Sequence, residues 1–336
     1  MPEPIHLIAE VGQAHDGSLG ILHSYIDAVA KTGVKIIKFQ VHIAEAESSP
    51  QEPFRVNFSY EDASRFDYWN RMSFPQSHWA EIKAHCDEAG LEFMASTFSL
   101  AAVDMMESID ILRYKVGSGE INNYLMLEKI ARTGKPILLS SGMSTFLELD
   151  RALEFLKPFG NEIAILQCTT SYPTSPENIG LNVIPQMMDR YPGHQIGFSD
   201  HSGKIYPCLA AVAMGASILE FHVVFDRQMF GPDSSSSLNL NEVSELVTAV
   251  KYIKTALDHP VDKNNNEGYA TLKGIFEKSL AVNKDLAAGH ELTLDDLESK
   301  KPAGMGIPAE NFAEVIGKKL KANKKAYEFL GRSDLW

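Results

Sequence analysis

Short apolar runs alternate along this chain with helix-length stretches whose apolar residues recur every three or four positions. Five consecutive runs, ILRYKVGSGE, PILLSSGM, AILQCTTSY, QIGFSDH and SILEFH, end in small polar or charged residues, and HLIAEVG, VKIIKFQ and LEFMASTF precede them. The intervening stretches, such as ILHSYIDAVAKTG and YLMLEKIARTG, have helical spacing and close on glycine, which is typical of a helix C-terminus. Eight alternations within roughly 225 residues predict a (β/α)8 barrel rather than an open sheet.

The polar residues that end these runs predict an active face. In a parallel barrel every strand points its C-terminal end at one mouth, where side chains from strand ends and loops converge. The residues expected at this mouth are Ser118, Glu120, Ser140, Thr170, Tyr172, Ser199, His201, Glu220 and His222.

Two regions depart from this period. The segment 44–75 is rich in prolines, aromatic residues and acids and shows no clear element, so we expect a long loop that acts as a lid or a partner surface, or else a disordered insertion. Asparagine, glycine and charged residues mark a linker over 261–276, after a barrel domain over 1–260. The remainder, 277–336, reads as short strands and turns with one helix, AENFAEVIGKK, and its small core should lean on another surface.

Composition narrows the class of protein. With 336 residues, 44% of them hydrophobic and 22% charged, the chain can bury one large core. It has no run of eighteen apolar residues and no secretory signal at its start, so we expect a soluble cytoplasmic protein without a membrane partner. The net charge of -13 argues against a nucleic-acid partner. Three irregularly spaced cysteines predict reduced thiols rather than disulfides or a zinc cluster.

The motifs at the ends of the runs resemble those of one enzyme family. IAEVGQAHDG, IIKFQ, YKVGSGEINNY, LLSSGM, CTTSYPT, GFSDHS, LEFHVVFDR and GPD resemble the sialic acid synthase family across essentially the whole chain. Its members, some of the spore-coat polysaccharide type, are transferases that condense phosphoenolpyruvate with an N-acylated hexosamine to make nonulosonic acids. The resemblance implies a TIM barrel followed by a small antifreeze-like (SAF, β-clip) domain.

Residue chemistry agrees with phosphoenolpyruvate as one substrate. Its phosphate and carboxylate need ammonium groups with hydroxyl donors close by. Lys38 and Lys115, at the ends of the second and fourth strands, supply the ammonium groups, and the resemblance adds Ser118, Ser140 and Ser199 to the same site. The alternatives are lysines that only pair with neighbouring acids, and serines that only satisfy backbone groups.

His201 and His222, at the ends of adjacent predicted strands, indicate a metal site. Two imidazoles suit manganese, zinc or cobalt better than calcium. The resemblance implies a divalent ion, usually manganese, that polarises the aldehyde of the open-chain sugar.

Proton transfer has four candidates, Glu10, Glu120, Tyr172 and Asp233. The resemblance assigns Glu120 to water or sugar hydroxyl chemistry and places Glu10 and Asp233 against the sugar, without separating their roles. Glu220, two positions before His222, is expected either to orient a neighbour or to be a paired acid.

Two departures from the family pattern concern substrate binding. Thr170 stands where these synthases carry asparagine, and it keeps a shorter donor toward phosphoenolpyruvate. Lys301 stands where the family commonly uses an arginine from a partner subunit to recognise the N-acyl group, and an ammonium cannot reproduce the planar guanidinium fork. We take both as signs of a different acceptor sugar or of weakened activity.

The acceptor itself stays open. N-acetylmannosamine, its 6-phosphate and a diacetamido-trideoxyhexose are all compatible with the residues, and the product would serve surface or spore-coat polysaccharides. The alternatives are another phosphoenolpyruvate aldol synthase of keto-sugar acids and a weakened sugar-binding paralogue. The resemblance also implies a domain-swapped homodimer in which the small domain, with Lys301, caps the partner's active site.

Overall fold

Eight parallel strands close into a barrel in the first of two compact units. The computed structural model describes residues 4–56 and 58–336, and the chain divides into Met1–His259 and Pro260–Trp336. The strands follow one another around the ring in chain order, and β8 pairs with β1 to close it. This confirms the predicted barrel, whose strands are β1 (His6–Gly12), β2 (Ile36–Val41), β3 (Glu92–Thr97), β4 (Tyr114–Val116), β5 (Ile137–Ser140), β6 (Ile163–Cys168), β7 (Gln195–Asp200) and β8 (Ile218–Val224).

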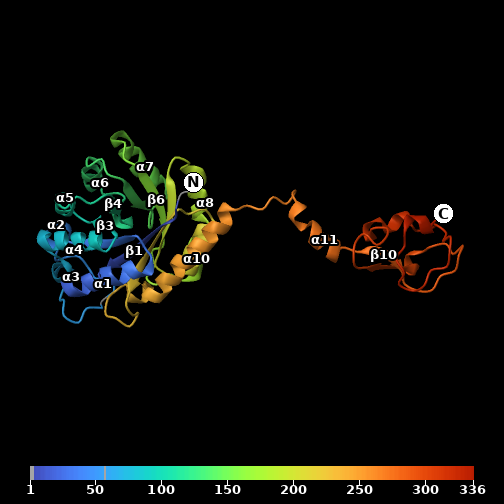
Figure 1. The fold of residues 1–336 in the computed structure, drawn as a ribbon. Coiled ribbons are helices and arrows are strands. Elements are labelled where there is room, and N and C mark those ends of the chain that lie inside the picture. The colour runs from blue at the N-terminus through green and yellow to red at the C-terminus, as the bar shows by residue number, and fades with distance from the viewer. Residues whose placement is uncertain (1–3, 57) are drawn as a thin grey trace. The chain divides into compact units, whose positions relative to one another are not determined.

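Helices connect the strands and cover the outside of the barrel (Figure 1). Side-chain oxygens cap several of their N-termini, as Ser18 does for α1 and Thr145 for α7. Among the described residues, no helix combines the length and the apolar character that a membrane crossing requires. The helices that follow the pattern are α1 (Leu19–Thr32), α4 (Gln76–Glu88), α5 (Leu100–Ser108), α6 (Tyr124–Ala131), α7 (Phe146–Leu156), α8 (Val183–Arg190), α9 (Tyr206–Ala213) and α10 (Leu240–Asp258).

The inside of the barrel is built in layers that position the site. Its lower part is a plug of apolar side chains, namely Ile8, Ile36, Met94, Leu138, Ala164, Leu166 and Ile218. Because side chains alternate along a strand, the residue two positions after an inward-facing one also faces inward. Two positions beyond five of these plug residues stand Glu10, Lys38, Ser96, Ser140 and Glu220, all buried. The polar floor of the mouth therefore rests directly on the apolar plug.

The segment 44–75 is not the structureless loop that we expected. It contains α2 (Ala44–Glu47) and α3 (Arg65–Met72), and a capping box between Ser64 and Asp67 starts the second of these. The helices are held by a small apolar cluster that includes Trp69 and Met72. These helices are too short to show a helical period in the sequence, and their packing against each other stabilises them.

The second unit is a small fold of short strands and turns. β10 (Ser279–Val282) and β11 (Leu297–Lys300) pair antiparallel above a core of aliphatic residues. The predicted helix AENFAEVIGKK was wrong in type, because Ala309–Glu314 forms a 3₁₀-helix kinked at Asn311. Its start is tied to the strand region, since the Ala309 N–H donates to the Lys278 carbonyl. Before this fold, the stretch expected to be a linker carries α11 (Ala270–Phe276).

Candidate functional site

The mouth of the barrel holds a cavity of about 460 Å³. It lies at the C-terminal ends of the strands, where the sequence placed the active face. Twelve of the thirteen predicted site residues line it: Glu10, Lys38, Lys115, Ser118, Glu120, Ser140, Thr170, Tyr172, Ser199, His201, His222 and Asp233. The thirteenth, Lys301, belongs to the second unit, where its ammonium lies 4.6 Å from the centroid of the Phe276 ring.

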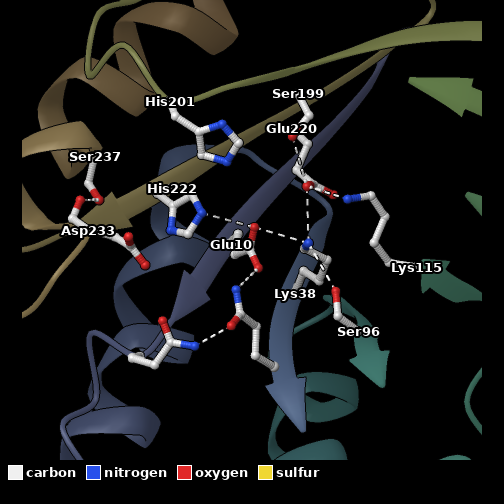
Figure 2. Close-up of polar contacts among 12 residues, drawn as sticks. Glu10, Lys38, Ser96, Lys115, Ser199, His201, Glu220, His222, Asp233 and Ser237 are labelled. Atoms are coloured by element: carbon white, nitrogen blue, oxygen red, sulfur yellow. Dashed lines mark hydrogen bonds and ion pairs between the residues drawn. The ribbon is translucent and has the colours of Figure 1, made fainter. Parts of the chain in front are cut away.

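The floor of the cavity is a buried network of two lysines and two glutamates (Figure 2). The Lys38 ammonium lies 3.0 Å from a carboxylate oxygen of Glu10 and 3.0 Å from Glu220 Oε1. Lys115 reaches the same Glu220 oxygen at 2.8 Å, and the Ser199 hydroxyl donates to it at 3.1 Å. Strand register explains this, because Lys38 and Glu10 are partners across β1 and β2, and Ser199 and Glu220 across β7 and β8.

Burial and charge act in opposite directions on these groups. Burial alone would raise the pKa of Glu220, but the ammonium groups of Lys115 and Lys38 lower it overall. The pKa of Glu10 is likewise lowered, since the attraction of Lys38 and His222 outweighs its desolvation. For Lys38 burial would lower the pKa, and the two carboxylates raise it instead. Glu10, Glu220 and Lys38 are therefore charged at neutral pH.

Both lysines of the network pair with acids. The sequence had left such pairing open as an alternative to binding the anionic substrate. Pairing and anion binding are compatible here, because both lysines also line the cavity. Two buried polar atoms of this floor, Ser140 Oγ and Glu220 Oε2, have no hydrogen-bond partner among the described residues. An unpartnered buried hydroxyl is costly unless a ligand or water satisfies it. Of the two expectations for Glu220, the paired acid is confirmed.

A close approach of three loops depends on Gly142. A Cβ added there would lie 2.6 Å from the Ser118 hydroxyl and 3.0 Å from a methyl carbon of Thr170. Any larger residue would therefore displace two of the predicted substrate-binding side chains. The glycine lets the loops after β4, β5 and β6 place both hydroxyl groups on one wall of the cavity.

His201 and His222 stand side by side, with ring centroids 5.2 Å apart. His201 Nδ1 lies 2.9 Å from the Thr169 carbonyl oxygen, and its Nε2 lies 3.0 Å from the Tyr172 hydroxyl. Burial lowers the pKa of His201 well below its usual value, and the neighbouring His222 lowers it further. Nδ1 therefore carries the proton toward the carbonyl, and neutral Nε2 keeps a lone pair for a metal or a donor.

This pair fits a divalent ion as part of a shared ligand set. Within residues 4–56 and 58–336, no three His, Cys, Asp or Glu side chains are arranged to hold a metal by themselves. The carboxylate nearest to the pair is Glu10, 3.2 Å from His222 Nε2. Two imidazole nitrogens with water and substrate oxygens suit manganese, zinc or cobalt. The residues present therefore fit an ion that is bound together with substrate.

Three of the predicted proton-transfer groups line the same cavity. Glu120 lies in a 3₁₀ turn after β4, accepts a hydrogen bond from Asn123 at 2.7 Å, and has a pKa that burial raises. Burial also raises the pKa of the Tyr172 phenol, which keeps its proton for donation. Asp233, in the loop after β8, pairs with Arg55 at 3.0 Å.

Sequence reasoning missed several residues of the cavity wall. Gln40 donates to Glu10 at 2.7 Å and contacts Gln13, and its place two positions after Lys38 could have revealed it. His42 is stacked between Trp69 and Phe98, with centroid distances of 3.9 and 4.7 Å. Trp69 belongs to the segment 44–75 and Phe98 to the loop after β3, so only the tertiary structure brings these rings together.

Arg55 is a further residue that was missed. Its guanidinium lies 4.1 Å from the centroid of the Tyr172 ring and pairs with Asp233, at the rim of the cavity. No local pattern in the segment 44–75 marks this arginine among its charged neighbours.

Comparisons with known proteins agree with this site. Residues 25–262 match the NeuB family, and 277–335 match the SAF domain. N-acetylneuraminate-9-phosphate synthase of Homo sapiens is 31% identical over 94% of this chain and 89% of its own. N,N'-diacetyllegionaminic acid synthase of Campylobacter jejuni is 31% identical over 96% of this chain and 98% of its own.

Solved structures give the same picture. N-acetylneuraminic acid synthetase from Leptospira borgpetersenii superposes with a TM-score of 0.71 at 28% identity, covering 80% of this chain and 90% of that one. The spore coat polysaccharide biosynthesis protein SpsE from Bacillus subtilis superposes with a TM-score of 0.65 at 26% identity, covering 100% of this chain and 96% of its own.

Proposed function

The chain belongs to the NeuB family, and we propose on that premise that it is a nonulosonic acid synthase joining phosphoenolpyruvate to an N-acylated hexosamine. The observation that carries this proposal is the convergence of two buried lysines, two neighbouring imidazoles and several acids in one cavity. Relatives named as synthases of three such acids, neuraminic, legionaminic and pseudaminic, support it. The reaction is a transfer that forms a carbon–carbon bond and releases phosphate.

Phosphoenolpyruvate binds on the floor of the cavity in this proposal. Its phosphate and carboxylate lie against Lys38 and Lys115, and the hydroxyls of Ser118, Ser140, Thr170 and Ser199 donate to their oxygens. The unpartnered Ser140 hydroxyl gains its acceptor in this way. Because Glu220 holds both lysine side chains in place, the site is preorganised for the anion before it arrives.

The acceptor sugar binds above it, with its open-chain aldehyde toward the histidines. A divalent ion held by His201 and His222, manganese first and zinc or cobalt as alternatives, would supply Lewis-acid polarisation of that aldehyde. Asp233 and Glu10 accept hydrogen bonds from sugar hydroxyls. The Tyr172 phenol, protonated at neutral pH, lies 3.0 Å from His201 and donates toward the oxygen on which negative charge develops.

The covalent steps balance without a further reactant except water. The methylene carbon of phosphoenolpyruvate attacks the aldehyde carbon, whose oxygen takes a proton. Water adds to the second carbon of the former phosphoenolpyruvate, and the bond from that carbon to the phosphate ester oxygen then breaks. Glu120 is the base for that water, because burial has raised its pKa toward the working range.

Assembly and compartment are parts of the same proposal. We propose a domain-swapped homodimer in which the SAF domain places Lys301 near the partner's sugar site. The protein would act in the cytoplasm, and its three buried free cysteines agree with a reducing compartment. The product would enter a surface or spore-coat polysaccharide, as the name of one relative suggests.

The test is turnover by the purified full-length chain. Phosphoenolpyruvate and manganese are incubated with N-acetylmannosamine, its 6-phosphate and diacetamido-trideoxyhexoses, and phosphate release and product mass are measured. We expect phosphate release that depends on the sugar, with a product mass that equals aldose plus pyruvate. The His201→Ala variant serves as the negative control. A protein that binds neither phosphoenolpyruvate nor manganese would refute the proposal.

A further inference from the structure

The charges that line the cavity are unevenly balanced. Among the described lining residues there are six carboxylates, Glu10, Glu47, Glu52, Glu120, Glu220 and Asp233, and four permanent cations, Lys38, Lys115, Arg55 and Arg65. The lining therefore holds two more carboxylates than lysine and arginine side chains, an excess that the divalent ion of the proposed function would only cancel. A cavity that must accept the anionic phosphoenolpyruvate therefore has little positive charge to offer a second anion.

Every one of these four cations already has a carboxylate partner. The two lysines share Glu220 on the floor, as described above. At the rim, Arg55 pairs with Asp233 at 3.0 Å, and the guanidinium of Arg65 lies 2.9 Å from Glu52. The described part of the barrel therefore provides no uncompensated ammonium or guanidinium group at the rim.

Aromatic rings hold both rim arginines in place. Arg55 lies over Tyr172, and Arg65 lies 4.9 Å from the centroid of the Trp69 ring. Further ring contacts join the segment 44–75 to the loop that holds Asp233, since the ring centroid of Phe230 lies 5.7 Å from those of both Phe58 and Tyr60. Turning either guanidinium toward a ligand would give up a stacked contact as well as an ion pair.

We infer that the cavity selects an unphosphorylated N-acylated aldose over the same sugar carrying a phosphate. This inference rests on the proposed function and names its acceptor class. A sugar phosphate carries a charge of about -1.5 to -2 at neutral pH. At this rim it would meet carboxylates, or it would compete with the partly buried Asp233 for the guanidinium of Arg55.

An uncharged acceptor fits the same groups well. Sugar hydroxyls donate to the carboxylate oxygens of Asp233 and Glu10, which can only accept. The guanidinium of Arg55 has five N–H donors and uses one nitrogen for Asp233, so an N-acyl carbonyl oxygen can accept from another without breaking that pair. Overall similarity does not decide the matter, because relatives named for a 9-phosphate and for a diacetyl acid are equally distant, at 31% identity.

The experiment compares binding and turnover for one matched pair of sugars. Full-length protein saturated with phosphoenolpyruvate is titrated calorimetrically with N-acetylmannosamine and with its 6-phosphate, and phosphate release is measured for both. We expect the phosphorylated sugar to bind at least about tenfold more weakly, as expected for like charges brought together. Equal or tighter binding of the phosphorylated sugar would overturn the inference. This holds also if a cation of the second unit is what binds the phosphate.

A charge-neutralising variant tests the cause. Asp233→Asn frees the Arg55 guanidinium, so the preference should shrink by a factor of about three or more. The control, Glu128→Gln, removes an equal charge from an exposed pair with Arg132 and should leave the preference unchanged. An unchanged preference in Asp233→Asn would refute the role of the rim pair. If neither sugar releases phosphate while the binding preference holds, the proposed function fails and the inference survives.

Discussion

Lys38→Met tests whether the floor of the cavity is held together by charge. Lys38 is buried, and its ammonium is 3.0 Å from Glu10 and 3.0 Å from Glu220. Methionine has a similar length and fills the same space without the charge. Glu220 keeps Lys115 in the variant, but Glu10 keeps only the hydrogen bond from Gln40 and its contact with His222, so one buried carboxylate loses its main counter-charge.

The expected loss of stability is large. Removing one partner of a buried ion pair costs about 3–5 kcal/mol, because the remaining charge is left desolvated and uncompensated. For a unit of this size, 1 kcal/mol shifts Tm by about 2–4 °C, so the barrel should melt roughly 6–20 °C lower. Phosphoenolpyruvate binding should also weaken by about 10- to 100-fold, since a charge-assisted hydrogen bond is lost.

The assay follows thermal and urea unfolding through the fluorescence of Trp69 and Trp79, which lie in the barrel. Trp336 is replaced by phenylalanine in every variant, so that the second unit does not contribute to the signal. Lys35→Met, at an exposed lysine three positions earlier, is the matched control and should change the free energy of unfolding by no more than about 0.5 kcal/mol.

The dependence of the free energy of unfolding on pH provides a second test of the same idea. In the parent protein the folded-state pKa of Glu10 is lowered, so its contribution is present above the ordinary carboxyl pKa and is lost as the pH falls. Without Lys38, burial should raise that pKa, and the variant should lose less stability on acidification than the parent. Adding Glu10→Gln should restore part of the loss. Lys38→Met that is as stable as Lys35→Met would refute this account of the floor.

Three further predictions concern the metal, the base and the second unit. His201→Ala should weaken Mn²⁺ binding, measured by calorimetry, at least about tenfold. The control His259→Ala, at an exposed histidine, should leave the affinity unchanged. If both variants bind Mn²⁺ with equal affinity, the metal assignment is refuted. Glu120→Gln should lower kcat about 10²- to 10⁴-fold. Because burial raises the pKa of Glu120, kcat/KM of the parent protein should fall as the pH drops through that raised pKa. The same pH profile in the Glu120→Gln variant would show that Glu120 is not the base. In the second unit, Asp296 is buried and bonded to Lys284, His290 and Thr293, and these partners lower its pKa although its burial opposes them. The contribution of Asp296 to stability should be present above the ordinary carboxyl pKa and be lost at lower pH. Asp296→Asn should therefore destabilise this unit at pH 7 by about 1–3 kcal/mol in urea unfolding and make its stability depend less on acid pH. The control Asp295→Asn, at the exposed neighbouring residue, should have neither effect.

The sequence alone determined the barrel and most of the polar residues at its strand ends that line the cavity. Strand and helix periods are local properties, and all strands of a parallel barrel end at one mouth, so the residues at the ends of the runs had to meet there. Gln40 also follows this rule, because it stands two positions after Lys38 in the same strand. These predictions needed no knowledge of which strand lies beside which.

The tertiary structure alone decided the pairing of charges and the short elements. Lys38 and Glu220 are 182 positions apart and meet because β8 closes against β1. Arg55 reaches Asp233 across 178 positions, from a segment whose two short helices depend on packing rather than on a helical period. The 3₁₀-helix Ala309–Glu314 has a sequence suited to an α-helix, and both its 3₁₀ form and the bond from its first residue to Lys278 are seen only in the tertiary structure. Contacts over such separations depend on ring closure and burial, which no local pattern along the chain encodes.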